Sequence, residues 1–289
     1  MIGPESMIGP ESDAEPGRAT MAGIYDYHLG GSANTAAERR IGDRMLSAFP
    51  HIRPVAAANR IFLHRAVRHL IRLGIRQFID IGSGMPTMGS THTVADGLVP
   101  DATRVVYVDN EPCTVRRAQS LIHHSGDPAR LAVIEADLRQ PDALWRQVVG
   151  TGLIDEAEPI GLLIIAVLHV RQPDSRGIDV APRAVARYRE LLGADSYLAI
   201  SHATNDGVPA TIKAGLSDVS RMYDADVTPV LARSRVDITG LFGDFDILPP
   251  GVVWTPLWHP EETVPGAPAV MFDSPAESAV LAGVAHKRR

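Results

Sequence analysis

The stretch from Gln77 to Thr87 constrains this chain more than any other. An apolar run from Phe78 to Ile81 carries one acid, Asp80, and two glycines, Gly82 and Gly84, follow at once. Such a run predicts a buried parallel strand, and the glycines predict a turn with positive φ where a ligand can approach the backbone. Doubly wound sheets bind their ligands at the carboxyl ends of such strands. The stretch therefore predicts a nucleotide-type site.

The glycine motif alone is weak, because an ordinary strand-to-loop turn has the same composition. It lacks the third glycine of the dinucleotide fingerprint and the Gly-Lys-Ser/Thr of a phosphate loop. The next apolar run, Arg104 to Asp109, strengthens the interpretation since it also ends in an acid. Asp109 follows Gly84 at close to the ~20-residue spacing at which an acid meets ribose hydroxyls. A carboxylate suits that task because its two oxygens can accept from two adjacent hydroxyl groups.

The rest of the chain alternates between strand and helix patterns. Strands are expected over residues 131–134, 161–168 and 196–200, and helices over residues 35–49, 54–73, 92–98, 112–123 and 182–192. This alternation predicts an α/β fold with a mostly parallel sheet, right-handed crossovers and helices on both faces. Two further runs, 245–248 and 252–255, flank Pro249-Pro250-Gly251 and predict a C-terminal antiparallel hairpin at the sheet edge. The expected sheet has seven strands.

The domain organisation follows from composition. Residues 1–20, in which Met-Ile-Gly-Pro-Glu-Ser occurs twice, are expected to be a disordered leader. One domain is expected over residues 21–260, with residues 21–73 forming an N-terminal helical arm that covers the site. Residues 24–34 make a poor helix and act either as a packed arm or as a lid. Residues 261–289 are expected to be a Pro/Ala-rich tail.

Bulk properties exclude several classes of function. The net charge of -6 argues against nucleic acid as the main partner. One cysteine, Cys113, permits no internal disulfide and no multi-cysteine zinc site, and no metal is expected. The start has no hydrophobic leader core and no apolar run reaches membrane-spanning length, so we expect a cytoplasmic protein without a membrane partner. Trp145 and Trp258 either pack on their own domain or form a homodimer contact.

Several segments together resemble a known family, the S-adenosylmethionine-dependent methyltransferases common in actinobacteria, whose acceptors are mostly unassigned. The resemblance covers residues 22–260 and implies the class I methyltransferase (Rossmann-like) fold with S-adenosyl-L-methionine as cofactor. The segments that carry it are Ile24-Tyr25-Asp26-Tyr27, Leu29-Gly30-Gly31, Asn34, Ala58-Asn59-Arg60, Phe78 to Pro86, Val105 to Pro112, Ala136 to Arg139, Val167 to His169 and Ser196 to His202.

The resemblance also implies roles for individual residues. It places Asp80, Gly82, Ser83 and Gly84 beside the methionine part of the cofactor, Asp109 at the ribose, Asn110 beside the adenine, Asp137 and Leu138 at the adenine amino group, and Ala166 to His169 near the sulfonium. The arm departs from the family pattern. Gly23 stands where relatives usually have arginine, Ser32 where many have lysine, and His28 replaces a usually apolar residue.

The acceptor side is less constrained. Tyr25, Tyr27, Asn34, Asn59 and Tyr223 are the candidate acceptor-contacting residues, and they indicate a partly apolar small molecule, such as one from secondary metabolism. Asn59, with the neighbouring Arg60, is also a candidate for binding a ligand carboxylate.

Methyl transfer is an in-line displacement that depends mostly on positioning, and a base matters only where the acceptor must lose a proton. His169 and His202 are the candidate bases, although each could instead hydrogen-bond a loop carbonyl. The fourth strand lacks the Asn/Asp-Pro-Pro-aromatic motif of amino-directed relatives, which disfavours amine and glutamine acceptors.

Three functions compete at this point. A small-molecule methyltransferase is the leading hypothesis. A protein that binds S-adenosylmethionine or S-adenosylhomocysteine without transferring the methyl group, as a sensor or interaction module, is the alternative. A nicotinamide oxidoreductase is the third, and the missing third glycine together with the terminal hairpin argues against it.

Overall fold

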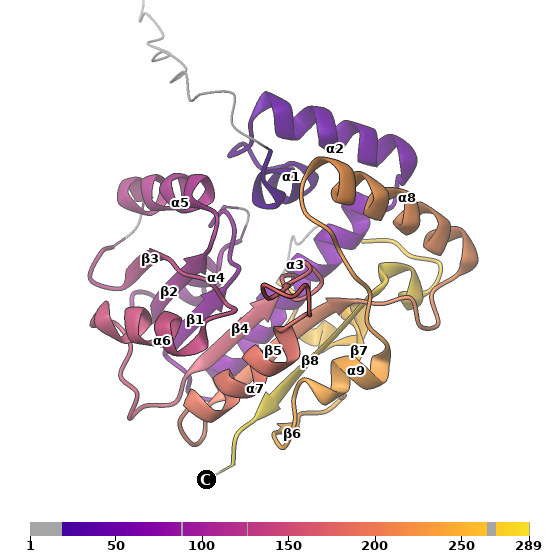
Figure 1. The fold of residues 1–289 in the computed structure, drawn as a ribbon. Helices are drawn as coiled ribbons and strands as arrows, with labels where there is room; N and C mark the ends of the chain where they lie inside the picture. Colours follow the sequence, from indigo (N-terminus) through magenta and orange to yellow (C-terminus); the bar gives the residue numbers. More distant parts are fainter. Residues whose placement is uncertain (1–18, 88, 126, 265–269, 289) are drawn as a thin grey trace, which may run out of the picture.

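The fold is built on one mixed sheet, seen in a computed structural model that describes residues 19–87, 89–125, 127–264 and 270–288. The parallel strands are β1 (Gln77–Ile81), β2 (Arg104–Asp109), β3 (Leu131–Glu135), β4 (Gly161–Ile165) and β5 (Tyr197–Ala203). The strand order is β3-β2-β1-β4-β5-β8-β6, with β7 also paired to β8 (Figure 1). β1 and β4 are parallel neighbours, and the order in which strands are added switches sides between them, which is where such folds bind ligands. The expected class I architecture is confirmed.

The antiparallel end of the sheet differs from the expected hairpin. β6 (Asp246–Ile247) and β7 (Val253–Trp254) pair with β8 (Val280–His286) and not with each other. β8 lies between them and β5, against which it pairs along its whole length. Residues 280–286, which the sequence analysis placed in the tail, are therefore part of the sheet, which has eight strands within the described part of the chain. β8 was not predicted because it contains alanine and glycine, which are depleted in strands. It is nevertheless buried on both faces.

Helices cover both faces of the sheet. α6 (Pro141–Gly150) and α7 (Ala181–Leu191) cover one face, and α3 (Ile52–Arg72) crosses the other, with α4 (Thr91–Asp96) and α5 (Pro112–Ser125) beside it (Figure 1). The short helix α9 (Arg235–Gly240) leads into the antiparallel edge. The helix expected over 54–73 begins two residues earlier than expected, and the others also lie within a few residues of the expected bounds.

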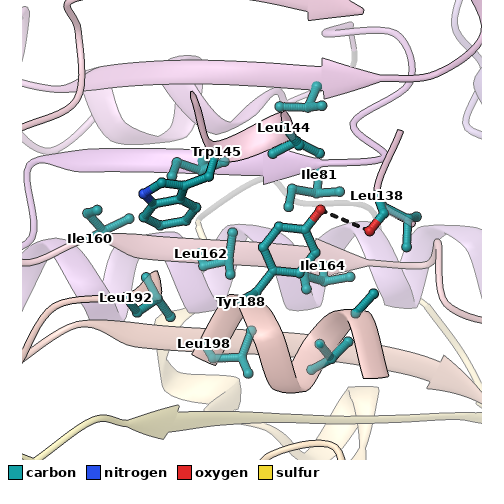
Figure 2. Packing of buried hydrophobic residues seen from close by; sticks show 14 of the residues in the cluster. Ile81, Leu138, Leu144, Trp145, Ile160, Leu162, Ile164, Tyr188, Leu192 and Leu198 are labelled. Atoms are coloured by element: carbon teal, nitrogen blue, oxygen red, sulfur yellow. Dashed lines mark hydrogen bonds between the residues drawn. The ribbon is translucent and has the colours of Figure 1, made fainter. Parts of the chain in front are cut away.

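The core under α6 and α7 also positions part of the site. Figure 2 shows Trp145 and Tyr188 packed against Leu162, Ile164 and their neighbours. The hydroxyl group of Tyr188 donates a 3.0 Å hydrogen bond to the carbonyl oxygen of Leu138. This bond fixes the loop after β3 from beneath. Both Trp145 and Trp258 are buried within the domain.

A third apolar cluster lies at the carboxyl ends of the parallel strands. It joins α1 (Met21–His28), α2 (Ala36–Ala48) and α8 (Ala210–Asp226) to the first turn of α3 (Figure 1). The expectation that residues 24–34 make a poor helix is wrong for α1, because the Thr20 hydroxyl caps it and buried Ile24 anchors it. α2 begins with a capping box formed by Thr35 and Glu38.

Most of the expected leader, residues 1–18, lies outside the described residues. Among the described residues, no helix is both long and apolar enough to cross a membrane.

Candidate functional site

A cavity of about 790 Å³ lies at the carboxyl ends of the parallel strands, walled by α1, α3 and α8. Pockets that enclose whole small ligands have volumes of this order. The sequence-predicted residues that line it are Tyr25, Asn59, Asp80, Gly82, Ser83, Gly84, Asp109, Asn110, Leu138, Ala166, His169 and Tyr223. Tyr27, Asn34, Asp137 and His202 do not line it. Residues from several separate segments of the chain therefore line one cavity.

The glycine loop after β1 has the predicted backbone. Gly82 and Gly84 have φ angles of 69° and 62°. A Cβ atom at Gly82 would lie 2.4 Å from Cγ2 of Val167, so only glycine fits there. The backbone N–H groups of Gly82 and Ser83 donate to the carbonyl oxygen of Val108 at 2.8 and 3.1 Å. The loop is therefore held open at the sheet edge.

Asp80 lies buried at one side of this loop. The hydroxyl group of Thr91 donates to its Oδ2 at 2.7 Å. Burial raises the pKa of Asp80 to about 6, and the positive charge of Arg60 opposes part of that rise. Arg60 also lines the cavity, and its Nε atom is buried without a hydrogen-bond partner among the described residues. An acid and a guanidinium thus face the same space.

Asp109 closes the opposite side of the loop. Its Oδ2 accepts from the backbone N–H of Gly84 and its Oδ1 from that of Glu111, both at 3.0 Å. Burial raises the pKa of Asp109, and these backbone hydrogen bonds counter the effect. A carboxylate has about four acceptor positions, more than these backbone groups use. Asp109 is therefore positioned rigidly while keeping acceptor capacity toward the cavity.

Asp137 is paired with Arg139 instead of facing the cavity. Its oxygens accept from the backbone N–H and the guanidinium of Arg139 at 2.7 to 3.0 Å. Burial alone would raise the pKa of Asp137, but the hydrogen bonds from Arg139 lower it overall. Arg139 itself lines the cavity and also donates to the carbonyl oxygen of Pro173 at 3.1 Å. The structure brings Asp80 and Asp109 together at the cavity and leaves Asp137 outside its lining.

The arm is fastened to the glycine loop through Asp26. Its buried carboxylate accepts from the Thr87 hydroxyl at 2.5 Å and from Nδ2 of Asn34 at 2.8 Å. Asn34 thus acts on the site indirectly, through Asp26. Tyr27 points away from the cavity, and its hydroxyl group donates to Oδ1 of Asp43 at 2.5 Å.

Tyr25 and Asn59 hold each other against the cavity wall. The Tyr25 hydroxyl group donates to the carbonyl oxygen of Ala56 at 3.1 Å and accepts from Nδ2 of Asn59 at 3.0 Å. The guanidinium of Arg60 lies 5.7 Å from the centre of the Tyr25 ring. Since its hydroxyl group is occupied, Tyr25 offers the cavity its ring. The Oδ1 atom of Asn59 is buried and has no partner among the described residues.

The two candidate bases have different surroundings. His169 lines the cavity, and its buried Nδ1 has no hydrogen-bond partner among the described residues. Burial and the nearby Arg233 lower the pKa of His169 to about 4. His202 is fully buried, and both its ring nitrogens are engaged: Nε2 accepts from Arg233 and Nδ1 donates to the carbonyl oxygen of Ala203 at 2.7 Å. Of these two histidines, His169 is the one placed to accept a proton from a molecule in the cavity.

Sequence reasoning missed part of the lining. Asp26, His28, Glu111 and Arg139 line the cavity without having been assigned to it. The periodicity of α3 could have predicted more of the cavity lining, because the lining residues of α3 lie on one face of that helix. They are Ile52, Val55, Ala56, Asn59, Arg60 and Leu63.

Comparisons with known proteins identify the family to which the chain is similar. The model of the S-adenosyl methyltransferase family matches residues 9–288. A crystal structure of a candidate methyltransferase from Thermobifida fusca is 34% identical, with a TM-score of 0.79, covering 94% of this chain and 96% of that one. A DUF574 family protein from Streptomyces avermitilis is 33% identical, with a TM-score of 0.79, covering 93% and 98%. A search of curated proteins gives no match.

Proposed function

The chain belongs to the S-adenosyl methyltransferase family, and we propose that it transfers a methyl group to a small, mostly apolar acceptor that carries a hydroxyl group. Enzymes of this family depend on S-adenosylmethionine.

The observation that carries the proposal is that the lining of one continuous cavity changes from polar to apolar. At one end stand Asp80, Asp109 and the glycine loop. At the other, α3 and α8 contribute Ile52, Val55, Leu216 and Val219. The lining residues of α3 run from Ile52 to Leu63, about 16 Å at 1.5 Å per residue. One cavity of this length has a polar end for a cofactor and an apolar end for an acceptor.

The residues at the polar end match the chemical groups of S-adenosylmethionine. Asp109 keeps free acceptor positions of the kind that ribose hydroxyls fill. Arg60 has an unpartnered buried Nε suited to a carboxylate, and Asp80 supplies a negative charge for an amino group or sulfonium. Gly82 and Gly84 let a ligand approach the backbone. Leu138, Asn110 and the aliphatic part of Arg139 would border the adenine.

When bound, S-adenosylmethionine supplies a methyl group on a sulfonium, which an acceptor displaces in line. The protein would hold the cofactor and the acceptor in position and exclude water from them. Ala166 and His169 follow β4 at the junction of the polar and apolar ends, and Tyr25 and Tyr223 offer aromatic surfaces to the apolar end. α1 and α8 form part of the cavity wall and so limit contact with water.

His169 would accept a hydrogen bond from the acceptor hydroxyl and take its proton as the new bond forms. Its low pKa keeps it neutral near pH 7, so a nitrogen lone pair is available. The same low pKa makes it a weak base, so we assign most of its effect to orienting the hydroxyl group. His202 and Arg233 stand behind it. The guanidinium of Arg233 donates to the carbonyl oxygen of Leu168 at 2.7 Å and so positions the segment that holds His169.

The experiment that tests the proposal is an acceptor screen with a direct readout of transfer. The protein is incubated with S-adenosylmethionine and apolar hydroxyl-bearing compounds, and mass spectrometry follows both S-adenosylhomocysteine and a gain of one methyl group on the compound. Methylation of a phenol or alcohol supports the proposal. Methylation only of amines, or of proteins or nucleic acids included as controls, would contradict it.

A further inference from the structure

Thr91 is a fully buried residue at the start of α4 that does not line the cavity. Its hydroxyl group nevertheless donates a 2.7 Å hydrogen bond to Oδ2 of Asp80, the acid at the polar end of the cavity. Oδ1 of Asp80 has no hydrogen-bond partner among the described residues, and it is not one of their fully buried polar atoms. Because Asp80 lines the cavity, Oδ1 is the oxygen that remains for a ligand.

Two neighbouring elements fix the position of Thr91. The hydroxyl group of Tyr107 on β2 accepts from the backbone N–H of His92 at 3.0 Å and lies 2.7 Å from Nδ1 of the same residue. From α3, Nε2 of His64 donates to the carbonyl oxygen of Gly89, just before α4, at 2.9 Å. The chain on both sides of Thr91 is therefore held in place, and its hydroxyl group has a defined position.

A hydroxyl donor has two effects on a buried carboxylate. Burial disfavours the charged form of Asp80, and a hydrogen bond donated to one oxygen stabilises that form. The terminal torsion of an aspartate side chain is otherwise broad, so the same bond also sets the direction of the second oxygen. A contact with a positively charged ligand needs both a negative charge and a defined oxygen, and one hydrogen bond supplies the two together.

We propose that Thr91 is a positioning residue for the cofactor: its hydroxyl group keeps the carboxylate of Asp80 ionised and turns Oδ1 toward a positive charge of S-adenosylmethionine. The inference rests on the proposed function, in which Asp80 faces an amino group or the sulfonium, and deepens it. Thr91 acts only through Asp80, since it does not line the cavity. Loss of its hydroxyl group should therefore change the pH dependence of cofactor binding, which a purely structural role would leave unchanged.

Other groups also act on the charge of Asp80. Arg60 of α3 favours its ionised form, and Asp109 of β2 disfavours it. Tyr107, the residue paired with Asp80 across β1 and β2, lies beside it. None of these groups changes when Thr91 is substituted, so a difference in pH dependence between variants reports the Thr91 hydroxyl group.

The test measures the affinity for S-adenosylmethionine by calorimetry between pH 5 and 8. Thr91→Val keeps the branched shape and removes the hydroxyl group, and we expect the midpoint of the pH dependence to rise by about one pH unit or more. Thr91→Ser keeps the hydroxyl group and should return the midpoint to that of the wild type. The matched control is Thr103→Val, which should keep the wild-type midpoint. Thr103 is equally buried, lies outside the cavity lining and has an Oγ1 atom without a partner among the described residues.

Carbon NMR of the Asp80 carboxyl group in the ligand-free protein gives a readout independent of the cofactor. The signal is identified by its loss in Asp80→Asn. Its titration midpoint should rise in Thr91→Val and in the smaller Thr91→Ala, so the test does not depend on one variant folding. Unchanged NMR midpoints in both variants, or a Thr91→Ser protein that behaves like Thr91→Val, would overturn the inference. A raised NMR midpoint without a matching change in cofactor binding would instead count against the contact between Asp80 and the cofactor in the proposed function.

Discussion

The backbone N–H of Gly84 donates a 3.0 Å hydrogen bond to Oδ2 of Asp109, which joins the loop after β1 to the end of β2. On the other side of the loop, the Thr87 hydroxyl group donates to Asp26 of the arm. The glycine loop is thus held from the sheet and from the arm at once. The carboxylates of Asp26 and Asp109 should therefore affect the shape of the glycine loop, the position of the arm and the binding of the cofactor.

Binding of S-adenosylmethionine should tighten as the pH rises from 5 to 7. Burial raises the pKa of Asp80 to about 6, so the carboxyl group is largely protonated at pH 5. A positively charged ligand favours the ionised form, and binding below pH 6 must release that proton. Calorimetry in buffers of different ionisation enthalpy measures the release. Asp80→Asn should flatten the pH dependence, and an affinity already independent of pH in the wild type would contradict the assignment.

Gly82→Ala should destabilise the fold more than Gly152→Ala. Both glycines have positive φ, 69° and 73°, so both substitutions carry about 1–2 kcal/mol of backbone strain. Only at Gly82 would the new Cβ meet a side chain, Val167, whereas nothing lies within 4 Å at Gly152. Urea unfolding measures the difference. Adding Val167→Gly, which removes the Cβ atom at 2.6 Å as well as both Cγ atoms, should recover part of the loss. Equal costs at the two glycines would show that the contact with Val167 is unimportant.

The fold should lose stability as the pH falls from 6.5 toward 4. Burial lowers the pKa of His28, His64 and His169 to about 4 and of His202 to about 3. In that window the unfolded chain binds more protons, so acid favours unfolding, by up to roughly 3 kcal/mol per site. The raised pKa values of Asp80 and Asp109 act in the opposite direction, but they are two groups against four. Unfolding free energies at pH 7, 6 and 5 check this, and an increase toward pH 5 would contradict it.

His169→Gln should lower the rate of methyl transfer about 100-fold, at the low end for loss of an acid–base residue because His169 is a weak base. Its affinity for S-adenosylhomocysteine should stay within about twofold of the wild type, since the proposed contact is with the acceptor. Single-turnover assays with an acceptor from the screen measure the rate, and calorimetry the affinity. The exposed His124→Gln serves as control. An unchanged rate in His169→Gln would remove His169 from the mechanism.

Local patterns were sufficient to predict the parallel half of the fold. The apolar runs of β1, β2 and β4 and the two positive-φ glycines follow from residue type and spacing. β8 was missed because distant segments place and bury it. β5, β6 and β7 pair with its edges, one face carries Ala285 into the core with α7, and the other carries Ala282 and Val284 into the core with α3. Likewise, α1 is helical because its cap and its packing outweigh a poor intrinsic preference.

At the site, Asp80 and Asp109 could be predicted because each lies at the carboxyl end of a strand. Asp137 lies in the same kind of position, but Arg139, two residues later, captures its carboxylate. His202 also ends a strand, and Arg233 occupies its free nitrogen. A residue's place at the end of a strand predicts that it lies at the ligand-binding edge of the sheet. Which groups its side chain then hydrogen-bonds depends on long-range contacts that the sequence does not reveal.

The central claim is that Asp109 and the glycine loop bind the ribose of S-adenosylmethionine. Calorimetric titration of S-adenosylhomocysteine into wild type and Asp109→Ala tests it most directly, with the exposed Asp244→Asn as control. We predict that Asp109→Ala weakens binding by about 10- to 100-fold, the loss of charge-assisted hydrogen bonds, while Asp244→Asn binds as the wild type does. A folded Asp109→Ala protein with wild-type affinity would contradict the claim.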